Sequence, residues 1–257
     1  RFEHPHLQHQ GLGYPDARTR PGRESIPALK RRAQPWSDTL MSDGTTAKWL
    51  EKLERRLPWL AVSNIASFVV GLQFIGFVLV YSDPSWTWRL ALIPELVLQG
   101  EIWRLLTFLA LPISLSPFWF LFVLWFLYFI VDGIENTWGA FKTTFYILIS
   151  VLLTICFSLV FMVPIAYVGD LESTLFLAAA ALNPEYQILL FLVLPVKIAW
   201  LAWLTGAFVL LRFMSGSWLD RLYLLAIYSN YLLFFGPYHY RQLKQRYRRW
   251  QFKRQLR

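Results

Sequence analysis

The pattern of hydrophobic and polar positions is dominated by long stretches without charge. One begins after Arg104 and ends before Asp132, and its residues are mostly aromatic and aliphatic. A helix needs about 20 apolar residues to cross the ~30 Å hydrocarbon core of a bilayer, so this stretch predicts a membrane-spanning helix over about 115–134. Similar uncharged stretches predict a first span within 57–82 and a third within 143–169.

The second half of the chain is less regular. Residues 173–182 form an apolar segment that is only ten residues long and rich in alanine. A segment this short does not face lipid across a full bilayer, and its small residues favour a helix buried among neighbouring helices. We expect residues 186–194 to lie in the membrane interface, a fifth span at 195–212 and a sixth at 219–236.

Two segments outside these spans mix apolar and charged residues. Residues 41–56 place leucine and tryptophan at helical spacing between charges, which predicts an interfacial amphipathic helix ahead of the first span. Residues 83–110 interleave tryptophan and leucine with scattered charges. They are too charged to span and too apolar for free solvent, so we expect a large outer loop that lies half in the interface.

Several polar residues fall within or beside the apolar stretches. Asn64 and Gln73 in the first span, and Asn230 in the sixth, are expected to face other helices and form hydrogen bonds there. Arg104, with its five donors, is expected to anchor the outer loop by donating to backbone carbonyls. Glu135 is expected to accept hydrogen bonds from the turn after the second span, and a proton relay is the alternative for this acid.

Composition agrees with a multi-span membrane protein, because 56% of the residues are hydrophobic and 16% are charged. The net charge of +9 is concentrated in the two tails, which is typical of membrane orientation and binding to anionic lipid rather than of nucleic-acid binding. Residues 237–257 are predicted to form a basic cytoplasmic tail on an anionic leaflet. This distribution places both termini in the cytoplasm, so the short segment 173–182 must cross. The basic side chains expected to face the lipid are Arg241, Lys244, Arg248 and Arg249.

The first part of the chain differs from the rest. Residues 1–40 are rich in Pro, Gly, Arg and His without apolar periodicity, which predicts a disordered basic tail. More regular sequence starts at Met41, and our hypothesis is that the preceding residues are a non-native extension. No metal or other cofactor is expected, since the tail's histidines have no cysteine or second ligand cluster nearby. The single cysteine, Cys156, lies within an apolar stretch and is interpreted as a small buried hydrophobic residue.

Three short motifs follow one another along the chain. GEIWRLLTF carries Trp103-Arg104 in the outer loop, Gly133-Ile134-Glu135-Asn136-Thr137-Trp138-Gly139 follows the second span, and Leu194-Pro195-Val196-Lys197 begins the fifth. With six spans and a short fourth helix, these motifs resemble the rhomboid-like superfamily over residues 57–236. The resemblance implies an all-α bundle of six transmembrane helices with an interfacial first outer loop. It also implies structural roles for Trp103, Arg104, Gly133, Glu135 and Gly139, the last three in a turn that closes the second helix.

The catalytic residues of that superfamily are not matched. Its proteases use a serine in Gly-x-Ser-Gly at the top of the fourth helix and a histidine in the sixth. Here the local sequence is Leu171-Glu172-Ser173-Thr174, and Ile227 stands at the position of the histidine. His239 lies beyond the sixth span, on the predicted cytoplasmic side. Because a serine needs a base within hydrogen-bond reach to act as a nucleophile, Ser173 is only a weak candidate.

The resemblance therefore implies a pseudoprotease. Inactive rhomboid-like proteins, the Derlins among them, bind transmembrane segments of other proteins in scaffold or quality-control roles, and we expect such segments and membrane lipids as partners. Two alternatives stay open at this point. One is an intramembrane serine protease with a non-standard site around Ser173, and the other is a structural subunit of a larger membrane complex. A transporter is disfavoured because we find no internal repeat.

Overall fold

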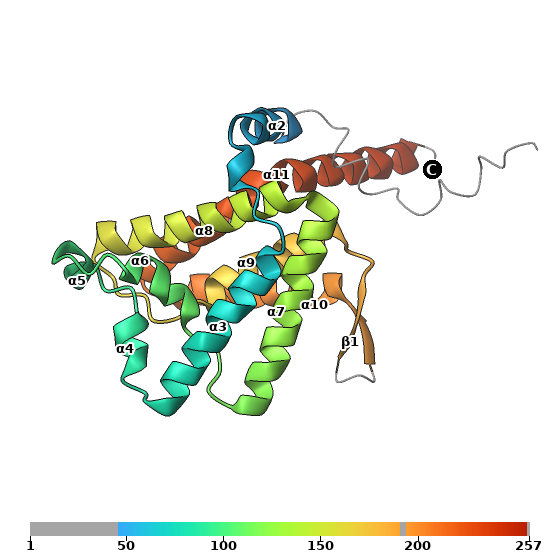
Figure 1. Ribbon diagram of the computed structural model, residues 1–257. Helices are drawn as coiled ribbons and strands as arrows, with labels where there is room; N and C mark the ends of the chain where they lie inside the picture. Colours follow the sequence, from blue (N-terminus) through green and yellow to red (C-terminus); the bar gives the residue numbers. More distant parts are fainter. Residues whose placement is uncertain (1–45, 191–193, 256–257) are drawn as a thin grey trace, which may run out of the picture. The chain divides into compact units, whose positions relative to one another are not determined.

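The computed structural model describes residues 46–190 and 194–255 and is predominantly helical (Figure 1). The expected all-α class is confirmed, apart from one small hairpin. Residues 1–45 lie outside the described residues, and with them the predictions for the tail, Met41 and the start of the interfacial helix. The helices are α2 (Thr46–Arg56), α3 (Ile65–Ser82), α4 (Trp86–Leu90), α5 (Pro94–Leu98), α6 (Arg104–Thr107), α7 (Pro117–Trp138), α8 (Ala140–Phe161), α9 (Gly169–Leu182), α10 (Ile198–Ser215) and α11 (Trp218–Gln255), with the 3-10 turns η1 (Pro58–Leu60) and η2 (Phe108–Ala110).

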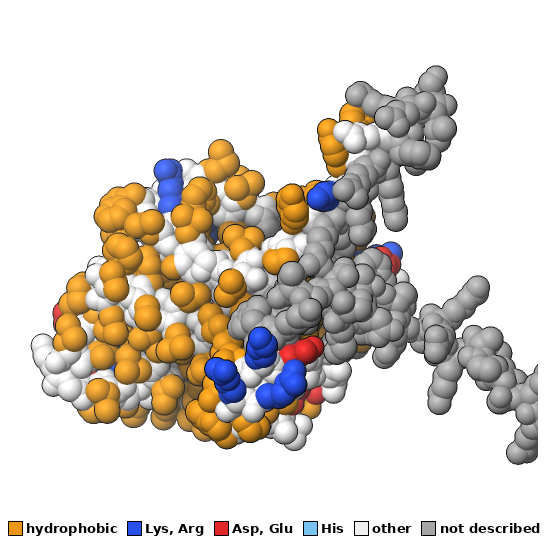
Figure 2. Space-filling view, turned by 90° about the horizontal axis from the view of Figure 1, so that it is seen from above, with side chains coloured by type: hydrophobic (Ala, Val, Ile, Leu, Met, Phe, Trp, Pro, Cys, Tyr) orange, Lys and Arg blue, Asp and Glu red, His pale blue; other side chains and the backbone are white. Residues whose placement is uncertain are grey.

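Within the described residues, four helices are long and apolar enough to cross a membrane: α3, α7, α8 and α10. Helix α9 has only 14 residues, and α11 combines an apolar first half with a strongly basic second half. Figure 2 shows hydrophobic side chains over most of the described surface on one face, which a water-soluble protein rarely exposes. These features define a multi-pass, α-helical membrane protein.

Helix α9 lies among the longer helices and contacts α7, α8, α10 and α11. Its run of alanines from Ala178 to Ala181 is buried, because small side chains let neighbouring helices approach closely. Helix α3 packs along α7, and α8 packs against α7 and α11. The prediction of a short helix that is buried among neighbouring helices is thus confirmed for α9.

Several predicted boundaries of the spans are wrong; the third span, expected within 143–169, is α8 from Ala140 to Phe161. The first long helix begins at Ile65 rather than near residue 57, because Pro58 opens a 3-10 turn and Asn64 adopts a left-handed conformation with φ 58°. The second continues to Trp138 instead of ending at 134. Its polar residues stay helical because they bond along the helix, as when Thr137 Oγ1 donates to the carbonyl of Gly133 at 2.8 Å.

Gly133 therefore does not belong to a turn. It lies inside α7, and the break comes at Gly139, whose φ of 93° favours glycine. Helix α8 starts immediately afterwards, at Ala140. The implied turn closing the second helix is thus a single residue rather than the whole stretch from 133 to 139.

The segment predicted as interfacial at 186–194 contains strand β1 (Gln187–Leu190), which pairs antiparallel with β2 (Leu194–Lys197). The register places Leu189 opposite Pro195. Helix α10 consequently begins at Ile198 rather than at Pro195. Helix α11 runs through Pro237 without ending, so the predicted basic tail continues the sixth apolar segment as one helix.

Candidate functional site

Three residues near the start of α9 each bond to a different helix. Asp170 accepts from Arg212 in α10, Glu172 accepts from Gln73 in α3, and Ser173 contacts Tyr228 in α11. Successive helical residues point about 100° apart, so closely spaced side chains reach different neighbours. We call these residues, Gln73, Asp170, Glu172, Ser173, Arg212 and Tyr228, the α9 polar cluster.

The strongest electrostatic contact of the cluster is the ion pair between Asp170 and Arg212. The Nη1 of Arg212 lies 2.6 Å from Oδ1 of Asp170. The aspartate side chain is 9% exposed, whereas that of the arginine is 49% exposed, so the guanidinium reaches in from the edge of the bundle. A carboxylate in the first turn of a helix is also favoured by the helix dipole. The ion pair fastens the last turn of α10 to the first turn of α9.

Gln73 connects α3 to the same turn. Its Nε2 donates to Oε1 of Glu172 at 3.0 Å and to the carbonyl of Leu109 at 3.1 Å. The side chain is buried, so the expectation that Gln73 faces other segments is confirmed. Asn64, in contrast, is exposed and contributes its backbone rather than its amide to the contacts between helices.

Two hydrogen bonds hold the hydroxyl of Ser173. Its Oγ donates to the carbonyl of Asp170 at 2.8 Å, and the hydroxyl of Tyr228 lies 2.5 Å away. Because the serine has one proton and the carbonyl can only accept, Tyr228 donates to Ser173. A tyrosine hydroxyl keeps its proton at neutral pH, so Tyr228 is not in the form that would accept the proton of Ser173. Among the described residues, no other side chain forms a hydrogen bond to Ser173 Oγ.

The rotation of α11 about its own axis determines which residues lie near Ser173. Ile227 is fully buried and packs in the core, whereas Tyr228, one residue on, points to Ser173. His239 forms its 2.6 Å hydrogen bond with Tyr231, on the same helix. Ile227, where the resemblance would place a histidine, is thus a packing residue, and the side chain beside Ser173 is the phenol of Tyr228.

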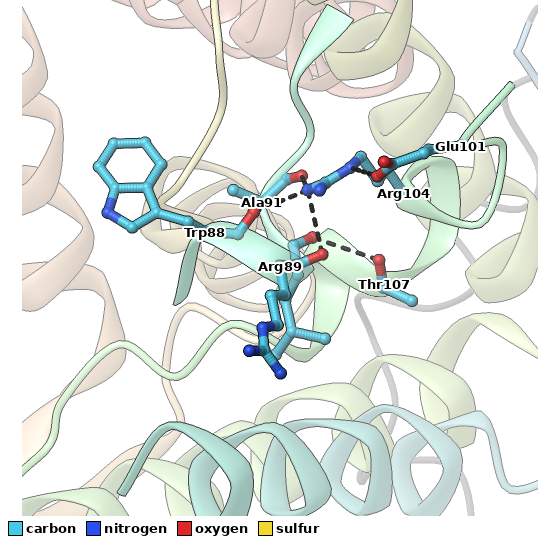
Figure 3. Close-up of polar contacts among 7 residues, drawn as sticks. Trp88, Arg89, Ala91, Glu101, Arg104 and Thr107 are labelled. Atoms are coloured by element: carbon cyan, nitrogen blue, oxygen red, sulfur yellow. Dashed lines mark hydrogen bonds and ion pairs between the residues drawn. The ribbon is translucent and has the colours of Figure 1, made fainter. Parts of the chain in front are cut away.

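The outer loop is organised around Arg104 (Figure 3). Its Nη1 donates to the carbonyls of Trp88, Arg89 and Ala91 at 2.7, 3.0 and 2.9 Å, and its Nε pairs with Glu101 at 2.6 Å. These carbonyls lie at the end of α4, where a helix has no backbone donors for them. The prediction that Arg104 anchors the loop through backbone carbonyls is confirmed.

Other contacts tie this loop to the bundle. Thr107 Oγ1 donates to the carbonyl of Leu90 at 3.2 Å, and Leu92 exchanges backbone hydrogen bonds with Ile165, between α8 and α9. Trp103 points outward and is 55% exposed. Trp103 and Arg104 therefore have separate roles: the arginine binds the loop together, and the tryptophan lies at its surface.

Glu135 is bonded to the start of α3 rather than to the turn that follows it. Its two carboxylate oxygens accept from the backbone N–H groups of Asn64 and Ile65 at 2.8 and 3.1 Å. Helix α7 continues past Glu135, so its own N–H groups are already paired, whereas the first N–H groups of α3 need acceptors. A carboxylate at a helix amino end is also favoured by the dipole.

Asn230 joins α11 to α8, as predicted. Its Nδ2 donates to the carbonyl of Tyr146 at 3.0 Å and to Ser150 Oγ at 2.6 Å, and the residue is fully buried. In the basic half of α11, Lys244 is exposed to the surroundings. The side chains of Arg241, Arg248 and Arg249 lie outside those that the structure describes.

Sequence reasoning missed part of the polar cluster. Arg212 was seen only as the end of a span, although a lone arginine there, with Asp170 and Glu172 before a short buried helix, is a signal for an interhelical ion pair. The contact of Tyr228 with Ser173 depends on the rotation of α11, which the sequence pattern does not fix. Comparison of the chain with protein-family models, with curated proteins and with solved structures found no match.

Proposed function

We propose that this chain is a catalytically inactive, rhomboid-like membrane protein that binds transmembrane segments of partner proteins. In this proposal six helices cross the bilayer, with α9 and the apolar half of α11 adding to the four long apolar helices. At 1.5 Å per residue, α9 is about 21 Å long, shorter than the hydrocarbon core. Its contacts with four other helices shield it from lipid.

The observation that carries the proposal is the bonding of Ser173. Its proton is donated to the carbonyl of Asp170, and its oxygen accepts from Tyr228. Activation of a serine needs a base that removes this proton. Tyr228, being a donor, holds the serine in place instead. The α9 polar cluster is accordingly assigned a binding and structural role rather than a nucleophilic one.

Helix α10 is the surface that fits a partner helix best. All its residues are described, and Ile198 is its one buried side chain, whereas α3, α7 and α8 each bury several. Trp200 and Trp203 are 71% and 79% exposed. The short α9 beside it favours local thinning of the bilayer, which lowers the cost of holding a foreign transmembrane segment there.

The experiment that tests this function is site-specific photo-crosslinking in the native membrane. A photoreactive amino acid replaces Trp203 in one variant and Phe68, an exposed apolar residue of α3, in the other. We expect adducts with membrane proteins at Trp203 and mainly with lipid at Phe68. Lipid adducts alone at both positions would contradict the proposed partner surface.

A further inference from the structure

The hairpin of β1 and β2 has two chemically different edges. At its base, the N–H of Ile198 donates to the carbonyl of Tyr186 at 2.8 Å. Backbone groups of a strand point alternately to one side and the other. Two residues further along the register, Ile188 and Val196 therefore also point toward each other, inside the hairpin.

The residues between them direct their backbone groups outward. In β2 these are Pro195 and Lys197. Proline has no N–H, and Lys197 is the N-cap of α10, with its ammonium paired to Glu185 at 2.7 Å. Proline and lysine are the residues with which natural proteins block a strand edge against further pairing. The outer edge of β2 is thus closed to another strand.

The outer edge of β1 is open. Its outward residues are Gln187 and Leu189, and among the described residues the sheet has two strands, so no third strand pairs with this edge. The sequence from Gln187 to Val196 has no charge. An isolated two-stranded hairpin is marginally stable. An edge of this kind is a template for one more strand.

We propose that this edge is a dimerisation surface, and that its occupant is strand β1 of a second copy of the chain. In antiparallel pairing about a twofold axis, Gln187 of each copy lies opposite Leu189 of the other, and each pair exchanges backbone hydrogen bonds. The strand order becomes β2-β1-β1-β2. Both outer edges are then the blocked edges of β2, so the assembly closes at two copies.

Charge agrees with self-pairing. Two identical strands placed side by side set like residues near one another, and like charges there are destabilising. The uncharged β1 avoids this, and Glu185 at its base is already neutralised by Lys197 of its own chain. The inference is independent of the proposed function, because it concerns neither Ser173 nor the surface of α10.

Substitution of Leu189 by proline tests the inference. Because the N–H of Leu189 points outward, Leu189→Pro removes the edge donor and leaves the bonds inside the hairpin, as Pro195 does on the facing strand. Leu189→Ala is the matched control, since it trims the side chain and keeps the N–H. Mass measurement of the full chain in detergent and in nanodiscs should give dimers for the wild type and Leu189→Ala. For Leu189→Pro we expect a dimer dissociation constant at least about tenfold higher.

Disulfide trapping tests the same pairing without a proline in the strand. All chains in this experiment also carry Cys156→Ala, which removes the native cysteine. A chain carrying Gln187→Cys is co-expressed with a differently tagged chain carrying Leu189→Cys, and we expect a disulfide between them. Chains carrying Pro195→Cys and Lys197→Cys, on the blocked edge, should not cross-link. A monomeric wild type, a Leu189→Pro dimer of unchanged affinity, or absence of the disulfide would each overturn the proposal. If Leu189→Pro fails to fold, the disulfide experiment decides.

Discussion

Arg212 near the end of α10 donates to Asp170 at the start of α9, with 2.6 Å between Nη1 and Oδ1. The aspartate is buried and the arginine is half-exposed, so the pair joins the core to the edge of the bundle. Among the described residues, no other ion pair joins two helices. Helix α10 buries only Ile198, so we expect this contact to matter for its position.

Loss of this ion pair should therefore loosen α10. Arg212→Gln leaves a buried carboxylate without its cation, and we expect destabilisation of about 1–3 kcal/mol. Asp170→Asn should cost a similar amount, whereas the double variant should cost less than the sum of the two. Thermal melting in detergent provides the measurement. Additive losses would mean that the two side chains do not interact.

Arg104→Ala should destabilise the outer loop, because three carbonyls near the end of α4 lose their donor. The expected loss is about 1–3 kcal/mol. Arg104→Lys should not restore stability, since an ammonium lacks the planar arrangement of donors. Arg89→Ala is the control: this arginine is exposed and stacks on Trp86 at the loop surface. Equal melting of all variants would contradict the anchoring role.

Gly76→Ala tests the packing of α3 on η2. A Cβ at residue 76 would overlap the carbonyl oxygen of Ala110, which is backbone and does not move away easily. We expect a loss of about 1–3 kcal/mol from overpacking. Gly71→Ala on the same helix is the matched control, because nothing lies near its added Cβ. Helix propensity alone would make that change neutral or favourable by up to about 1 kcal/mol.

The chain should not cleave transmembrane substrates. Without a base, Ser173 lacks the acid–base assistance that is usually worth ~10²–10⁴-fold in rate. Purified protein in liposomes is incubated with transmembrane substrates and, separately, with a fluorophosphonate probe. We expect no cleavage and no labelling, with identical results for Ser173→Ala and Tyr228→Phe. Cleavage that disappears in Ser173→Ala would replace the pseudoprotease assignment with a protease.

Reporter fusions test the six-span proposal and the orientation of the chain. Fusions after Met41 and after Arg257 should both report the cytoplasm, because an even number of crossings returns the chain to its starting side. A fusion in the hairpin loop between β1 and β2 should also be cytoplasmic, since α9 would be the fourth crossing. An external carboxyl terminus would mean that α9 or α11 does not cross.

The sequence by itself determined the class of protein and the approximate positions of the four long apolar helices. Uncharged stretches of more than 20 residues have few alternatives to a membrane helix, because hydrophobicity is local and additive along the chain. Arg104 and Asn230 could also be assigned correctly. A multivalent donor in an apolar setting has to find acceptors nearby, and a buried amide has to bond to a neighbouring helix.

Only the tertiary structure decided the partners of the remaining polar groups. Glu135 bonds to residues about 70 positions earlier, and Tyr228 meets Ser173 from 55 positions away. Such pairings depend on how each helix is rotated and where it ends, and hydrophobic periodicity is weak in helices that are apolar on all sides. The hairpin was missed for a related reason: an uncharged run of leucine, isoleucine and valine suits a buried strand as well as a membrane segment. Whether residues 187–190 form a strand depends on the segment that folds back and pairs with them, which is β2.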